Sequence, residues 1–186
     1  MRPLIVFDIE ATCDANMARK KREIIEIGAI KIVNGVVVDS FSSLVKPKQH
    51  PQLTSYCKNL THIKQSDIDS AQDPHTVLLA FAEWSKNCVL AAWGEFDSEI
   101  IQKEMHKNKI ENELVFINFK KVYLSIRKLP FTYSLQDALK SERIHFQGAM
   151  HRAYDDAYNT YLIYEKNKTK MDEMIRKIYS RNAFLD

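Results

Sequence analysis

Three strand-like segments open the chain, and an Asn-Gly pair joins the second to the third. Residues 3–9 form an apolar run, and residues 23–33 and 36–45 have the apolar character of two further strands. Asn34-Gly35, between these two, is the strongest short hairpin signal, because both residues tolerate the positive φ that a tight hairpin turn requires. We therefore expect the chain to begin with three antiparallel strands.

Alternating helix and strand signals follow the hairpin. Asp73-Pro74 is a cap and first-turn pair, and apolar residues at helical spacing come after it. Residues 88–93 and 115–118 predict two more strands. Further helices are expected at 96–107, 119–128, 134–140, 153–165 and around 171–179. A strand hairpin followed by alternating helices and strands predicts an α/β fold around a mixed sheet.

Composition narrows the class of protein. The chain has 186 residues, of which 45% are hydrophobic and 27% charged, which suits one folded domain and argues against disorder. We expect this domain to cover residues 1–180, with a flexible tail at 181–186. There is no run of 18 apolar residues to span a membrane, and Asp8 and Glu10 interrupt the N-terminal apolar run, which argues against a signal peptide.

The cysteines and the charge bear on location and partners. Three cysteines without metal-ligand spacing predict reduced thiols in a cytoplasmic protein. The net charge of +3 is compatible with a nucleic-acid partner but does not predict one. Arg19, Lys20, Lys21 and Arg22 form the one dense basic run, either a solvated loop or a contact for a phosphate backbone.

Two acidic residues stand out on the first strand. Asp8 and Glu10 are two positions apart, so their side chains point to the same face of the strand. Two carboxylates among apolar neighbours repel each other and are costly to desolvate, and a hard divalent cation relieves both effects. The alternative is a solvent-exposed face at the end of the strand.

Further candidates occur later in the chain. Asp97 follows the predicted strand 88–93, where ligand sites of α/β sheets lie, and His151 and Asp156 open a late helix. Each has a simpler explanation, since acids in a first helical turn complement the helix dipole and a histidine there can be a cap. The ordered set is more informative, because one central site could collect all of these residues.

This ordered set resembles that of the DEDDh exonucleases, and the resemblance covers residues 3–165. Within them, the chain is similar to the Eri-type group, which includes histone-mRNA 3′-exonucleases and bacterial KapD-like proteins. The segments that carry this similarity are FDIEATC (7–13), EIIEIGAIKI (23–32), NLTHIKQSDI (59–68), WGEFD (93–97), FINFKKVY (116–123), SLQDAL (134–139) and FQGAMHRAYDDAYNT (146–160). The resemblance implies a ribonuclease H-like fold, with a five-stranded mixed sheet of three antiparallel and then two parallel strands, flanked by helices.

The resemblance also implies an activity. The implied activity is that of a 3′→5′ exonuclease that acts on single-stranded nucleic acid with a free 3′ end. RNA is favoured over DNA as the substrate, and the released products are nucleoside 5′-monophosphates. Two Mg²⁺ ions, for which Mn²⁺ is a substitute, are implied as cofactors. The implied metal ligands are Asp8, Glu10, Asp97 and Asp156, and the implied catalytic residues are His151, as the base that activates water, and Glu10.

The terminal nucleotide needs a pocket, and the resemblance implies its residues. They are Ala11 and Thr12 near the sugar, and Thr61, Ile63 and Trp93 near the sugar or base. Trp93 suits base stacking, and its alternative is a core position at the end of a strand. His62 departs from the pattern, because many relatives have glycine there, which puts the shape of the base pocket in question.

Three alternative functions stay open. A ribonuclease H-type endonuclease also uses clustered acids and two metals, but the segment from His151 to Asp156 favours an exonuclease. A non-catalytic nucleic-acid-binding regulator on the same fold would have lost part of the acidic set, which is intact here. A DNA proofreading-type exonuclease differs in substrate, and the Eri-like segments favour RNA by analogy alone.

Overall fold

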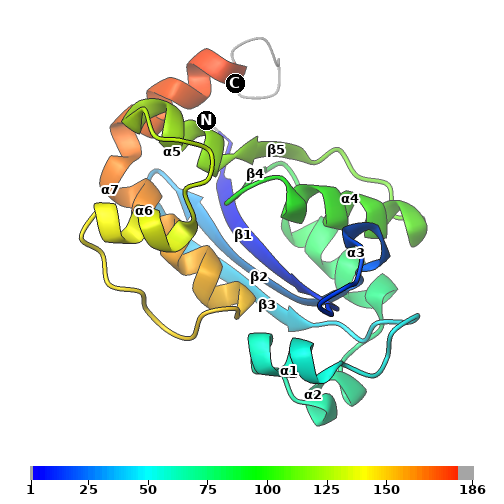
Figure 1. Cartoon of the computed structure of the whole chain (residues 1–186). Helices are drawn as coiled ribbons and strands as arrows, with labels where there is room; N and C mark the ends of the chain where they lie inside the picture. The colour runs from blue at the N-terminus through cyan, green and yellow to red at the C-terminus, as the bar shows by residue number, and fades with distance from the viewer. Residues whose placement is uncertain (1, 180–186) are drawn as a thin grey trace.

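The computed structural model describes residues 2–179, and its centre is a mixed five-stranded sheet (Figure 1). The strand order is β3-β2-β1-β4-β5, in which β1 pairs antiparallel with β2 and parallel with β4. The strands are β1 (Leu4–Ala11), β2 (Ile24–Val33), β3 (Val36–Leu44), β4 (Val89–Ala92) and β5 (Val115–Asn118). Three antiparallel strands followed by two parallel ones confirm the predicted fold class. The tail predicted at 181–186 lies outside the described residues.

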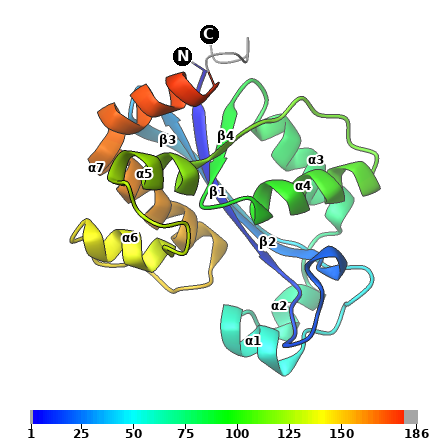
Figure 2. The same cartoon turned by 45° about the horizontal axis from the view of Figure 1, so that its top comes forward.

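Helices cover both faces of this sheet (Figure 2). They are the short 3₁₀ helix η1 (Arg19–Lys21) and the α-helices α1 (Ser55–Thr61), α2 (Gln65–Asp69), α3 (Pro74–Trp84), α4 (Phe96–Lys107), α5 (Phe119–Arg127), α6 (Leu135–Ser141) and α7 (Ala153–Tyr179). Helices α3 and α4 lie on one face, and α5, α6 and α7 lie on the other. No described helix combines the length and apolar character needed to cross a lipid bilayer.

The alternation of β1 decides which face its acidic residues occupy. Ile5 and Phe7 are buried in the apolar core beneath α3 and α4, whereas Val6 belongs to the core beneath α5 and α7. Asp8 and Glu10 continue the Val6 side, because side chains alternate along a strand. Both acidic side chains therefore face the layer that contains α7.

Two features of the helices differ from the prediction. Helices α1 and α2 were not predicted, and α7 is one continuous helix where two were expected, at 153–165 and 171–179. The intervening segment 166–170 is polar, and it continues the helix because it contains neither glycine nor proline. Lys168 also forms a 2.7 Å ion pair with Asp172 one turn later. Polarity there marks an exposed stretch of helix.

Gly28 permits the closest approach between the sheet and α7. It lies in β2 opposite Asp8, and a Cβ atom at this position would be 2.0 Å from the Tyr154 backbone nitrogen and 2.2 Å from the Ala153 carbonyl carbon. Only a residue without a side chain fits there. The first turn of α7 is thereby packed against the strand pair that presents the acidic residues.

We expect Gly28→Ala to destabilise the protein by about 1–3 kcal/mol, because the added methyl group must displace backbone atoms of α7. Ser42→Ala is a matched control, since Ser42 is the β3 partner of Gly28 and is exposed. Chemical unfolding of both variants measures the difference. Equal stability of the Gly28 and Ser42 variants would show that the contact with α7 is not tight.

Candidate active site

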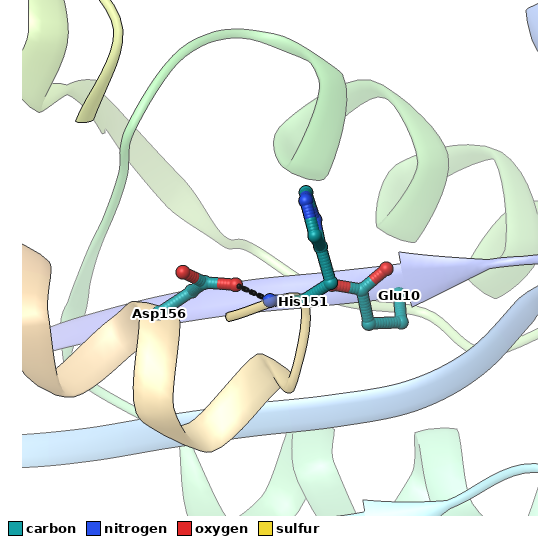
Figure 3. Close-up of side chains that lie close together, drawn as sticks. All are labelled: Glu10, His151 and Asp156. Atoms are coloured by element: carbon teal, nitrogen blue, oxygen red, sulfur yellow. Dashed lines mark hydrogen bonds between the residues drawn. The ribbon is translucent and has the colours of Figure 1, made fainter. Parts of the chain in front are cut away.

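Three predicted residues form a compact cluster that fits a metal ion. Glu10 comes from β1, His151 from the turn before α7, and Asp156 from the first turn of α7 (Figure 3). One ligand atom from each of the three lies within 4.8 Å of the others. The His151 backbone N–H donates to Asp156 Oδ2 at 2.9 Å, which holds the loop before α7 against its first turn. Residues far apart in the sequence thus present oxygen and nitrogen ligands to one point.

Asp97 reaches the same part of the sheet from the other side of β1. It is buried in the first turn of α4, and its Oδ1 accepts a hydrogen bond from the Ile9 backbone N–H at 3.1 Å. This N–H is available because β1 pairs with β4 only from Leu4 to Val6. Asp97 is therefore attached to β1 between Asp8 and Glu10, beyond the end of β4 where it was predicted.

Burial and the charges of nearby carboxylates raise the pKa of all four carboxyl groups. Desolvation is the largest cause in each case, and it raises the pKa of Asp8 well above its ordinary value. Desolvation and the charge of Asp156 raise the pKa of Glu10 to about 8. The pKa of Asp97 rises to about 7, and that of Asp156 to about 6. Such a set is electrostatically incomplete without cations, and its oxygen ligands suit Mg²⁺ or Mn²⁺.

Sequence reasoning missed one buried ion pair beside the cluster. Glu26 lies opposite Glu10 in β2, and its carboxylate accepts hydrogen bonds from Arg152 at 2.7–3.2 Å. The same carboxylate accepts the Ala153 backbone N–H at 2.9 Å, at the start of α7. Glu26 therefore holds Arg152, which directly follows His151, and the N-terminus of α7, the helix that carries Asp156. The available signal was the second glutamate of EIIEIG and the arginine of HRAYDD.

Four of the predicted pocket residues come from the C-terminal ends of β1 and α1. Ala11, Thr12, Thr61 and Ile63 are all buried. The two threonine hydroxyls are engaged within the protein: Thr12 Oγ1 accepts from the Glu23 backbone N–H at 2.9 Å, and Thr61 Oγ1 donates to the Cys57 carbonyl at 2.9 Å. These side chains are consequently packed within the protein, and Ala11 directly follows Glu10 in the chain.

Trp93 lies apart from those four residues, just beyond β4. Its ring is half-buried and packs against Tyr123, with ring centroids 5.6 Å apart. Its Nε1 is buried without a hydrogen-bond partner among residues 2–179. The ring therefore contacts the core and is also partly exposed, and base stacking by Trp93 stays a prediction.

His62 occupies a position that favours glycine. It ends α1 with φ of 60°, in the left-handed region, and its backbone N–H donates to the Lys58 carbonyl at 3.0 Å. Glycine is the common residue at such a helix end because it has no Cβ to clash. The side chain of His62 is exposed.

We expect the metal-free protein to lose stability as pH rises from about 4 to about 8. The folded-state pKa values of Glu10, Asp97 and Asp156 are raised to about 8, 7 and 6, above those of the unfolded chain. The folded state therefore binds more protons, and the stability linked to these protons is lost as pH rises through the raised values.

A divalent cation opposes this loss, so the rise in Tm on adding Mg²⁺ or Mn²⁺ should be larger at pH 8 than at pH 6. Thermal unfolding with excess chelator and with excess metal, at both pH values, checks this. A metal-induced shift that is equal at the two pH values would contradict the assignment of these carboxylates as ligands.

Comparison with known proteins matches residues 5–164 to the family described as Exonuclease. The chain is 28% identical over 196 residues to ERI1 exoribonuclease 2 of Danio rerio, covering 89% of this chain and 35% of that protein. It is 27% identical to the probable 3′-5′ exonuclease KapD of Bacillus subtilis, covering 87% and 82%. The chain thus spans about a third of the length of the zebrafish relative.

Among solved structures, the chain is similar to the nuclease domain of 3′hExo, a DEDDh family member, bound to rAMP. The TM-score is 0.82 at 24% identity, over 90% of this chain and 92% of the other. This similarity supports the ribonuclease H-like fold, and the family match covers the strand, helix and loop segments that supply all five clustered residues. The chain belongs to the exonuclease family.

Proposed function

We propose that this protein is a metal-dependent 3′→5′ exoribonuclease that removes nucleotides one at a time from single-stranded RNA. The observation that carries the proposal is the site itself: Glu10, His151 and Asp156 converge within 4.8 Å, and Asp97 is bonded to the strand between Asp8 and Glu10. The preference for RNA and for a free 3′ end is supported by the names of the zebrafish relative and of the rAMP-bound structure.

Asp8, Glu10, Asp97 and Asp156 would hold two Mg²⁺ ions, with Mn²⁺ as a substitute. When bound, two such ions orient water and offset the charge of the reacting phosphate and of the leaving oxygen. The fit rests on the convergence of Glu10, His151 and Asp156 within 4.8 Å, and the raised pKa of the four buried carboxyl groups supports it. Arg152 is the cation beside Glu10, and its guanidinium is paired with Glu26.

His151 would accept the proton of the attacking water at its imidazole. Its side chain is exposed, so an approaching phosphodiester can come into contact with it. The water oxygen forms a bond to phosphorus, and the bond from phosphorus to the 3′-oxygen of the penultimate nucleotide breaks. The products are a nucleoside 5′-monophosphate and a strand one nucleotide shorter with a new 3′-hydroxyl.

The terminal nucleotide would be held by residues at the ends of β1 and α1. Ala11 and Thr12 would face its sugar, with Thr61 and Ile63 beside the sugar or base. Trp93 would stack on the base through the accessible part of its ring.

End-labelled oligonucleotides test this function. Matched linear RNA and DNA strands labelled at the 5′ end should give a ladder shortened from the 3′ end, faster for RNA, and chromatography should detect nucleoside 5′-monophosphates. A circular RNA of the same sequence should survive. Cleavage of the circle as fast as of the linear strand would identify an endonuclease, and faster degradation of DNA would favour the proofreading type.

A further inference from the structure

The basic run between β1 and β2 is folded onto the start of α4. Its 3₁₀ helix η1 contains Arg19, Lys20 and Lys21, and both views show this segment beside α4 (Figures 1 and 2). The Arg19 guanidinium carbon lies 4.7 Å from the centroid of the Phe96 ring, and that of Arg22 lies 5.8 Å from it. One aromatic ring therefore holds two arginines in place.

These cations are not neutralised within the protein. Arg19, Lys20 and Lys21 are exposed, and none forms an ion pair with a carboxylate of residues 2–179. The contrast is with Arg127 and Arg152, whose guanidinium groups pair with the buried carboxylates Glu142 and Glu26. A guanidinium on an aromatic face keeps its N–H edges free for a second partner.

This surface is hollowed and adjoins the active site. A cavity of about 310 Å³ is lined by Arg19, Lys20, Phe96, Glu99, Ile100 and Lys103. Phe96 directly precedes Asp97, and the charge of Arg19 extends to the Asp97 carboxyl group, whose pKa it lowers. Lys103 closes one side, since its Nζ donates to the Arg22 carbonyl at 2.5 Å. Glu99 is the single acidic residue of the lining.

We propose that this cavity binds the phosphate backbone of the substrate strand, on the 5′ side of the bond that is cut. The inference rests on the proposed function, and it adds a second anchoring point to the terminal pocket. Arg19 and Lys20 would contact phosphate oxygens through charge-assisted hydrogen bonds. A single strand suits the position, because its flexible backbone can bend from the carboxylate cluster around the start of α4.

Salt dependence of binding tests this proposal. For single strands, each phosphate contact contributes about −0.7 to the slope of log K against log salt concentration. Arg19→Gln/Lys20→Gln should therefore make the slope less negative by about 1.4, measured by fluorescence anisotropy with a labelled 20-nucleotide RNA in excess chelator, which prevents turnover. With metal present, KM of the variant for this RNA should rise roughly tenfold or more. The rise in KM should be much smaller for a dinucleotide, which does not extend to the cavity.

Lys170→Gln/Arg176→Gln is the matched control. It removes the same charge from exposed positions at the far end of α7 and should leave slope and KM unchanged. Phe96→Leu retains an apolar side chain but removes the ring, so it should weaken binding in the same direction if the ring orients the arginines. Folding of each variant is checked by its Tm.

The outcomes separate the two proposals. A slope and KM of the Arg19/Lys20 variant equal to those of the control, while the wild type degrades RNA, would overturn the backbone site and leave the proposed function standing. If the salt slopes of the wild type and the Arg19/Lys20 variant differ as expected, but the wild type releases no mononucleotide, the proposed function is overturned instead.

Discussion

Asp8→Asn is expected to reduce mononucleotide release to the background rate while making the metal-free protein more stable. The substitution preserves the size of the side chain and removes one charge from a group that four other carboxylates repel: Glu10, Glu26, Asp97 and Asp156. Metal binding needs that charge, whereas in the metal-free protein the same charge lowers the stability of the fold. Activity and stability should therefore change in opposite directions, as occurs at functional sites that are optimised for ligands.

Two measurements on this variant check both effects. Titration calorimetry should show weaker binding of Mn²⁺, and thermal unfolding in chelator at pH 8 should show a higher Tm, by about 2–4 °C for each kcal/mol of relieved repulsion. Asp14→Asn is the control, because Asp14 is exposed just beyond the same end of β1. Full turnover by the Asp8 variant, or by the wild type in excess chelator, would contradict metal-dependent catalysis at this site.

Replacing His151 should lower kcat by about 10²–10⁴ and leave metal affinity largely intact. The imidazole is the only part of the residue that could accept the proton of water, whereas the backbone N–H makes the hydrogen bond to Asp156. His151 has φ of 60°, which asparagine tolerates better than alanine does. His151→Asn is thus preferable to His151→Ala for removing the base without disturbing the loop, and both variants should lose activity alike.

Saturating metal is essential in this comparison. Protonation of Asp156 and Asp97, whose pKa values are raised to about 6 and 7 without metal, would also reduce activity at acid pH. At saturating metal the ligands stay ionised, and an acid limb present in the wild type and absent in the variants would belong to His151. Near-normal kcat would show that the proton leaves by another route, and lost metal affinity would show that His151 organises the cluster instead.

The identity of the catalytic candidates follows from local rules. Side chains two apart on a strand share a face, so the strand pattern alone pairs Asp8 with Glu10. Asn34-Gly35 predicts the hairpin because only a few residues tolerate its turn, and the position of Asp97 after a short apolar strand places it at the ligand-binding edge of the sheet. Each of these inferences uses neighbours close in the chain.

Tertiary structure decided what holds the site together. Glu26 and Arg152 are 126 residues apart, Asp97 and Ile9 are 88 apart, and no periodicity links either pair. Gly28 resembles any strand glycine until α7 is seen against it. The basic run at Arg19–Lys21 was equally consistent with a solvated loop, and only its packing on Phe96 set it beside Asp97. The physical reason is that local preferences depend on backbone geometry over a few residues, whereas contacts between distant segments exist only once the sheet and its helices have packed.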